Sequence, residues 1–170
     1  SLTITGSGTN RALALAPLAE ANGTATITVT ADDQAGGTAT NSFLLTVLAA
    51  NDAPSFTLAT NVVVTLEDTP VTLTDFATNI LPGPADEAKQ TVSFIVSADP
   101  VFFLPQPAIS TNGTLSFKPA RNVVVGSTIV AVYLKESGDT ASGGINRSLD
   151  PVKTFMIVIL PAIDAPVLNI

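Results

Sequence analysis

The chain has 170 residues, of which 46% are hydrophobic and 12% charged, a composition typical of folded rather than disordered proteins. Its formal net charge of −7, with seven scattered Lys and Arg residues, argues against nucleic-acid binding, which needs clustered basic side chains. Every apolar run is shorter than the roughly 20 residues of a membrane-spanning helix, so no membrane insertion is expected. Because Cys and His are absent, thiol nucleophiles, imidazole bases and the usual zinc ligands are excluded.

Residues 1–50 show the two-residue hydrophobic periodicity of strands and no periodicity typical of a helix. In residues 24–31, "TATITVTA", apolar Ala, Ile and Val alternate with Thr. This period of two predicts a strand with one buried face and an outer face of threonines, whose branched side chains favour extended backbone. Asn22-Gly23 before the strand predicts a turn, because both residue types tolerate positive φ.

Residues after 50 predict a complete β-sandwich. Strands are expected at 56–65, 70–76, 91–98, 101–110, 114–118, 127–135 and 152–160. Seven short strands in about 110 residues, separated by turn residues, indicate an immunoglobulin-like Greek-key sandwich. The strand at 127–135 is apolar on both faces, so its outward Ile129 and Tyr133 are expected to lie under a loop or a neighbour.

An internal repeat sets the predicted domain boundaries. "SFLLTVLAANDAP" (42–54) aligns without a gap to "TFMIVILPAIDAP" (154–166), and "TNRALALAP" (9–17) aligns to "TNGTLSFKP" (111–119). Asp52 and Asp164 lie 112 residues apart, about one domain length. The alignment predicts the C-terminal half of one module at 1–50, a complete module at 51–163 and the first strand of a third at 164–170. The chain is therefore expected to come from a longer tandem array.

Three segments carry a resemblance to a known family. They are "GPADEAKQTVSFIVSADPVFFLPQPAISTNGTLSFKP" (83–119), "LKESGDTASGGINRS" (134–148) and the closing "DAP" (164–166). Together they resemble the cadherin-like/Ig-like tandem repeats of very large bacterial surface and secreted proteins. The resemblance implies extracellular β-sandwiches in tandem, and cadherin-type members bind calcium at the junctions between modules. Because no motif places a catalytic base, the chain is expected to be non-enzymatic. "LAANDAPSF" (48–56) resembles the cadherin linker Asp-x-Asn-Asp-x-x-Pro, with Ala49 at the place of the first Asp.

Strand order predicts where acidic side chains meet. In an up-and-down count, the loops after the second and sixth strands of the complete module lie beside the incoming linker, and Glu20 of the preceding half-module is expected there too. Ca²⁺ binds six to eight oxygen ligands, which such a convergence supplies. The alternative is that these residues only cap their own turns. The predicted calcium ligands are Asn51, Asp52, Asp86, Glu87, Glu136 and Asp139.

Two functions are compatible with these observations. The first is a spacer or adhesion module of an extracellular protein, whose partners are neighbouring modules, a cell-surface protein or a polysaccharide. The alternative is a polysaccharide-binding accessory module, which needs exposed aromatic faces; the chain has no Trp and one Tyr, and either Phe102 or Phe103 is expected to point outward. A truncated first module would also have open strand edges, so self-association is expected there, with "APVLNI" (165–170) as one donor strand.

Overall fold

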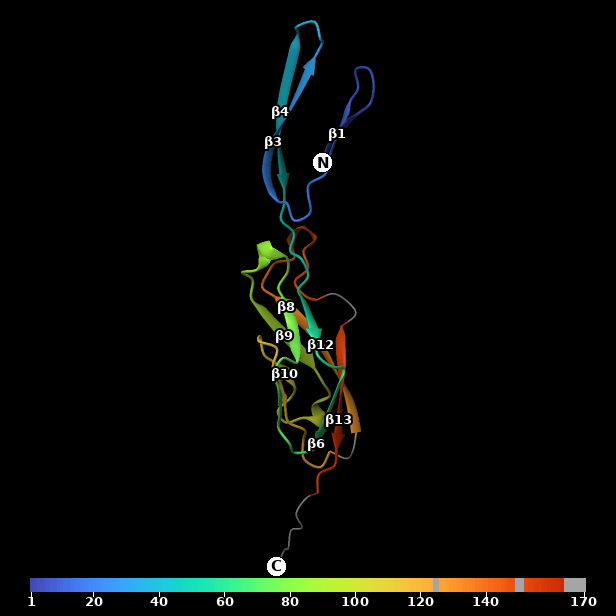
Figure 1. The fold of residues 1–170 in the computed structure, drawn as a ribbon, viewed down its shortest axis with the longest axis vertical. Helices are drawn as coiled ribbons and strands as arrows, with labels where there is room; N and C mark the ends of the chain where they lie inside the picture. The colour runs from blue at the N-terminus through green and yellow to red at the C-terminus, as the bar shows by residue number, and fades with distance from the viewer. Residues whose placement is uncertain (124–125, 149–151, 164–170) are drawn as a thin grey trace, which may run out of the picture. The chain divides into compact units, whose positions relative to one another are not determined.

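The structure is a computed structural model that describes residues 1–123, 126–148 and 152–163 (Figure 1). Its regular structure in these ranges consists of β-strands and short 3-10 helices, without an α-helix. No helix in the described part is long and apolar enough to cross a membrane. The chain divides into two compact units, unit 1 (Ser1–Ala50) and unit 2 (Asn51–Ile170), and each is described by itself.

Unit 1 consists of two antiparallel strand pairs, and the longer pair contains the strand predicted from the alternating threonines of residues 24–31. β1 pairs with β2, and β3 pairs with β4 from Gly23↔Val47 to Asp32↔Thr38. The outer threonines bond across the hairpin, with 2.9 Å between the Thr28 and Ser42 hydroxyls. The strands are β1 (Leu2–Thr5), β2 (Ala12–Leu15), β3 (Gly23–Asp32) and β4 (Thr38–Val47).

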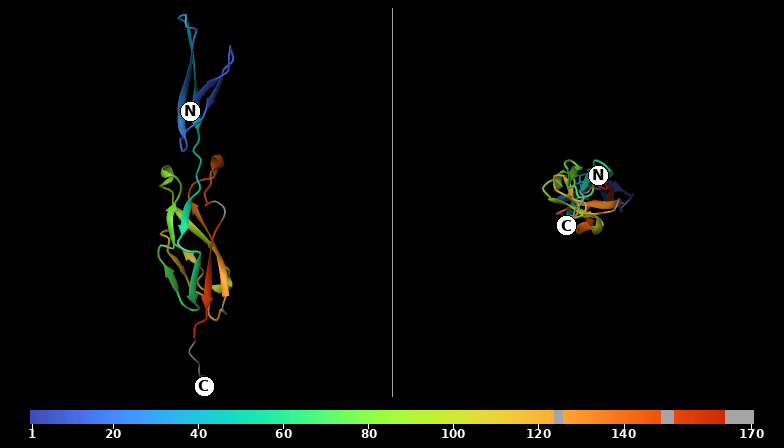
Figure 2. Two further views of the ribbon diagram at one scale, coloured as in Figure 1. Left: turned by 45° about the vertical axis from the view of Figure 1, so that its right-hand side comes forward. Right: turned by 90° about the horizontal axis from the view of Figure 1, so that it is seen from below.

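Unit 2 is a β-sandwich (Figures 1 and 2). One sheet has the order β6-β13-β12-β9, in which β6 runs parallel to β13 and the other neighbours are antiparallel. The opposite layer contains β10-β11-β7 and the pair β5-β8. The strands are β5 (Ser55–Leu58), β6 (Val62–Leu66), β7 (Val71–Leu73), β8 (Ala77–Leu81), β9 (Val92–Ser97), β10 (Ala108–Ile109), β11 (Leu115–Phe117), β12 (Gly126–Glu136) and β13 (Lys153–Leu160).

The core of unit 2 is built from alternate residues of facing strands. Their side chains interdigitate between the layers, where Phe76 and Phe155 meet edge-on with ring centroids 4.8 Å apart. Because the period of a strand is two, one residue of each adjacent pair faces this core and the other faces away. The largest buried contributors are Phe56, Phe76, Phe103, Leu115, Phe117, Val130, Val132, Leu134, Phe155, Ile157 and Ile159.

The strand expected at 56–65 is divided in two by a change of sheet. Ala59 donates from its main-chain nitrogen to Phe76 in one layer, while the Asn61 carbonyl accepts from Met156 in the other. β5 therefore belongs to the layer of β8, and β6 to the layer of β13. A single continuous strand cannot belong to both layers of the sandwich, so the chain crosses from one layer to the other at residues 59–61.

The prediction of a strand at 101–110 is wrong for most of this segment. Pro100–Phe102 forms a 3-10 helix (η2), and only Ala108–Ile109 is a strand. Pro100, Pro105 and Pro107 lack the N–H that a ladder requires, which explains the loss. β8 was not predicted because Asn79 has a φ of 50°, and the irregularity there breaks the alternation of its side chains. The first strand expected at 164–170 lies outside the described residues.

Candidate functional site

Asn51 connects the linker to both loops at the N-terminal end of unit 2. Its amide nitrogen donates to Glu136 Oε1 and to the main-chain oxygen of Ile145, at 2.7 Å each. Its amide oxygen accepts from Gln90 Nε2 at 2.7 Å, and its carbonyl accepts from the Ile145 N–H at 2.8 Å. The four residues Asn51, Gln90, Glu136 and Ile145 are called the Asn51 clasp below. The clasp makes the linker from Asn51 onward a structural part of unit 2.

Two glycines leave the space that the Asn51 side chain fills. A Cβ added to Gly138 would lie 1.8 Å from Asn51 Oδ1, and one added to Gly144 would lie 2.9 Å from Asn51 Cβ. Both distances are shorter than a van der Waals contact, so no larger residue fits either position without displacing Asn51. Gly138 and Gly144 of the β12–β13 loop are therefore explained by close packing around the linker.

The carboxylates beside the clasp are held by main-chain donors. Glu136 is only 3% exposed, and its Oε2 accepts from the N–H of Gly138. Glu87, in the 3-10 helix η1 (Ala85–Glu87), accepts from the Asp52 N–H through Oε1 at 3.0 Å. Two buried oxygens, Glu87 Oε2 and Gln90 Oε1, have no hydrogen-bond partner among the described residues. Buried polar atoms are normally paired, so these two point to a ligand or water at this end of the unit.

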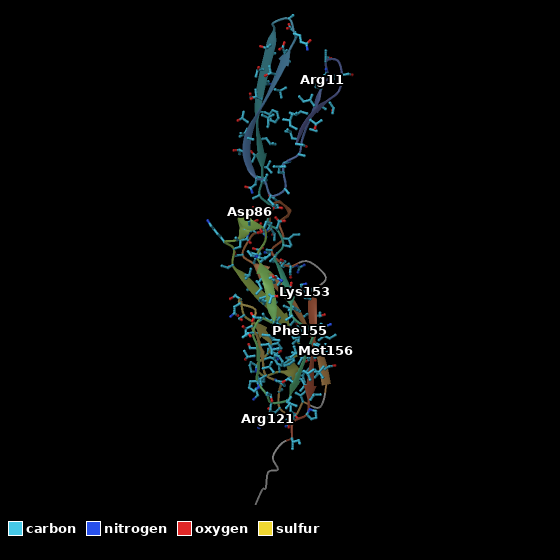
Figure 3. The ribbon with its side chains drawn as sticks, in the orientation of Figure 1. Arg11, Asp86, Arg121, Lys153, Phe155 and Met156 are labelled. Atoms are coloured by element: carbon cyan, nitrogen blue, oxygen red, sulfur yellow. The ribbon has the colours of Figure 1, made fainter. Side chains whose placement is uncertain are left out.

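Three of the six predicted calcium ligands meet here, and three do not. Asn51, Glu87 and Glu136 lie in one hydrogen-bonded group with Gln90. Asp52 takes part through its main-chain N–H rather than its carboxylate. Asp86 is exposed on η1 (Figure 3), and Asp139 is exposed and accepts from the Ala141 N–H in its own turn at 2.9 Å. Glu20 lies in unit 1.

The donor set of the clasp fits a hard cation in part. Every candidate ligand is an oxygen, the donor type that Ca²⁺ requires. However, among residues 1–123, 126–148 and 152–163 no three His, Cys, Asp or Glu side chains form a group able to hold a metal. A cation here would depend on the two unpaired oxygens, together with amide and main-chain oxygens. Gln90 was missed by the sequence analysis because it follows the acidic pair in a loop and carries no charge.

The other end of unit 2 also uses a buried glutamate as a main-chain acceptor. Glu67 accepts from the Ala162 N–H at 3.0 Å, and its own N–H donates to the Leu160 carbonyl at 2.9 Å. Asp68 pairs with Arg121 at 3.6 Å, a largely exposed contact of small energetic value. Glu67 thus fastens the outgoing chain as Asn51 fastens the incoming one.

Aromatic side chains do not form a platform for sugars in the described part of the chain. Phe103 is buried in the core against Phe117, with ring centroids 5.5 Å apart. Phe102 is half-buried and packs against the same core, so the expectation that one of this pair points outward is wrong. Phe102 ends the 3-10 helix η2 and Phe103 follows in extended backbone, so simple strand alternation does not apply to this pair.

One acidic side chain in unit 1 has a clear local role. Asp33 accepts from the N–H groups of Ala35 and Gly37, both at 2.8 Å, in the loop between β3 and β4. These donors stabilise the carboxylate and hold the pKa of Asp33 below its ordinary range. The interaction closes a turn, as expected for an acid in a hairpin loop.

Comparison with solved structures identifies the architecture. Two crystal structures of human protocadherin-24 EC1-2 match with a TM-score of 0.56 at 16% identity, one covering 95% and the other 94% of this chain, and in each case 76% of that chain. The chain has the fold of tandem cadherin domains. At this identity the cadherin likeness concerns the fold alone. No protein-family model and no curated protein sequence matches the chain.

Proposed function

We propose that the chain is a non-enzymatic, extracellular repeat segment that serves as a structural spacer or adhesion module in a large bacterial surface or secreted protein. The tandem cadherin fold and the resemblance of residues 83–119 and 134–148 to bacterial repeats support this role. The observation that carries the proposal is the Asn51 clasp, which builds the linker into the head of unit 2.

A linker fastened in this way suits a spacer. Each residue whose dihedral angles are held by the module no longer contributes freedom to the connection between modules. The clasp holds Asn51 by side chain and main chain, and Pro54, three residues later, is buried and has a fixed φ. The connection therefore keeps fewer free residues than a linker of the same length in solution.

The stiffness of the connection provides a direct test. Labels in unit 1 and unit 2 should give a narrow distribution of distances in electron-spin resonance, and Asn51→Ala should broaden it by removing the contacts to Gln90, Glu136 and Ile145. Asp139→Ala, a change in the same loop outside the clasp, is the control and should leave the distribution unchanged. An equally broad distribution in the unaltered chain would refute a stiff spacer.

Calcium is proposed as an additional stabiliser of this end of unit 2. The two buried oxygens without partners, Glu87 Oε2 and Gln90 Oε1, support the proposal. A ligand that binds only the folded state raises the free energy of unfolding by about 2.7 kcal/mol at a hundredfold excess over Kd. The melting temperature should therefore rise with Ca²⁺ relative to chelator in the unaltered chain and in Asp86→Asn, whose side chain lies in solvent, but not in Glu87→Gln. An unchanged melting temperature would leave the clasp as a metal-independent fastening.

A further inference from the structure

The outward face of the β6-β13-β12 sheet in unit 2 is apolar. Each of these strands turns one set of alternate side chains into the core and the other set away from it, as the buried Phe155 and the half-buried Met156 on β13 illustrate. Apart from Ser127, Lys135 and Thr154, the outward positions of the three strands are filled by Val, Leu, Ile, Met, Ala and Tyr. The six residues used to define this outer face are Val64, Ile129, Tyr133, Met156, Val158 and Leu160.

The outer face is open to solvent and almost free of charge. Ile129 is 67% exposed and Val64 60% exposed, so the expectation that a loop covers Ile129 is not met by any described loop. β9 adds Ser93, Ile95 and Ser97 on the same side. Lys135, at the edge nearest the loops, carries the one charged side chain at these outward positions. Contiguous exposed apolar surface of this kind marks interaction sites.

Unit 1 shows that the fold does not require an apolar surface there. Ile129 and Tyr133 of β12 correspond in the repeat to Thr26 and Thr30 of β3, and Val158 of β13 corresponds to Thr46 of β4. At these three positions unit 1 has threonines suited to water and unit 2 has large apolar side chains, whereas the counterparts of Met156 and Leu160 are leucines in unit 1 as well. The difference at Ile129, Tyr133 and Val158 is therefore a property of unit 2, and a surface for binding explains it.

We propose that the outer face of unit 2 binds the same face of a second copy of this chain. The distribution of charge indicates where two copies can meet. The chain carries a formal charge of −7, so two copies repel each other through most of their surface. The outer face brings no acidic side chains together, and it provides no charges to attract a basic or acidic partner. A two-fold interface uses one patch on both subunits, which an uncharged apolar face satisfies.

The size of the face suits a weak dimer. β13 has 8 residues and neighbouring strands lie about 4.8 Å apart, so the four-stranded face has a flat area of roughly 500 Å². This area does not include the additional surface of the protruding side chains. Stable interfaces bury about 800 Å² on each partner, so this face alone supports association in the micromolar range or weaker. Such weak pairing, repeated along tandem modules, would add up through multivalency. The inference gives a partner to the proposed adhesion role, but the dimer stands or falls independently of the stiff linker.

The only tyrosine and the only methionine of the chain lie on the outer face, and Trp is absent. Tyrosine fluorescence therefore reports on Tyr133 alone, and oxidation of methionine by hydrogen peroxide reports on Met156 alone. The test uses the full chain in sedimentation velocity over a range of concentrations, with both probes recorded in parallel. The variant Ile129→Thr/Val158→Thr introduces the residues of unit 1 and keeps the β preference of the strands. The control Val101→Thr/Leu104→Thr alters two exposed apolar residues elsewhere in unit 2.

The unaltered chain and the control should dimerise, while Ile129→Thr/Val158→Thr should raise the Kd at least tenfold. Dimerisation should change the emission of Tyr133 and slow the oxidation of Met156, and high salt should preserve or strengthen it by screening the net charge. A chain that stays monomeric up to millimolar concentration refutes the proposal. An unchanged dimer Kd in the Ile129→Thr/Val158→Thr variant also refutes the proposal. Such a result would place the interface elsewhere, for example on the strand edges of unit 1. Probe signals that change only with phosphatidylcholine vesicles or soluble cellulose, without a dimer, also overturn the proposal.

Discussion

Phe43 and Phe155 occupy the same position in the repeat, on β4 of unit 1 and β13 of unit 2, yet Phe43 is 45% exposed and Phe155 only 2%. Val29 and Val132 differ in the same way, at 37% and 0%. The two units thus share an apolar pattern but not its burial. In unit 2, β5–β9 provide the opposing surface and the neighbouring strands. By the sequence alignment, β2, β3 and β4 of unit 1 correspond to β11, β12 and β13 of unit 2.

The outer faces differ in the opposite sense. β3 presents threonines to water, and Thr28 and Ser42 bond to each other across the hairpin. β12 presents Ile129 and Tyr133 at the corresponding positions. The comparison teaches that an apolar residue on a strand is a candidate for burial, and that its partner can be another strand of the same unit or a surface outside it.

The largest expected effect separates the two phenylalanines. Phe155→Ala removes a ring packed edge-on against Phe76 and should lower the free energy of unfolding of unit 2 by about 3–5 kcal/mol. Phe43→Ala removes a half-exposed ring and should cost unit 1 roughly 1 kcal/mol or less. Urea denaturation followed by circular dichroism measures both. Equal losses would show that Phe43 is buried in solution by a partner, and that the contrast between the units is smaller than the structure indicates.

A medium effect is expected at the clasp, which has no counterpart in the described part of unit 1. Gly138→Ala places a methyl group on Asn51 Oδ1 and should destabilise unit 2 by about 1–3 kcal/mol, through lost hydrogen bonds to a buried carboxylate. Asn51→Ala should cost a similar amount. Because both changes break the same contacts, the double variant should cost little more than either alone. If the losses in the free energy of unfolding were additive in thermal unfolding experiments, Gly138 would be required for something other than the space that Asn51 occupies.

The smallest effect concerns the hairpin loop of unit 1. Main-chain donors lower the pKa of Asp33 in the folded state, so its contribution to stability is complete above the ordinary aspartate pKa of about 3.9 and is lost as the pH falls through the lower folded value. An NMR titration should place the Asp33 midpoint below 3.9, and Asp33→Asn should remove this pH dependence. A midpoint at or above the ordinary value would show that the loop is not closed in solution.

Prediction from the sequence worked where the chain follows one periodicity. β3 and β12 were located within one or two residues by alternation and flanking turns. β8 and η2 were not, since a left-handed Asn79 and a cluster of prolines replace periodicity with irregular backbone. At the head of unit 2, strand order predicted that Asn51, Glu87 and Glu136 approach each other, and their binding of calcium stays a prediction. Gln90 and Gly138 could not be found in this way, because their roles depend on loop geometry.

The sequence by itself determined the all-β class and which strands alternate. Those properties follow from side-chain periodicity and backbone preferences, which act over a few residues. Alternation along β12 also predicted that Ile129 faces away from the core. Only the tertiary structure decided that no described part of the chain covers Ile129, which is 67% exposed. It also decided that a linker asparagine is enclosed by two glycines 87 and 93 residues away in the sequence. Burial and close packing require a second surface, and a local pattern does not specify where that surface comes from.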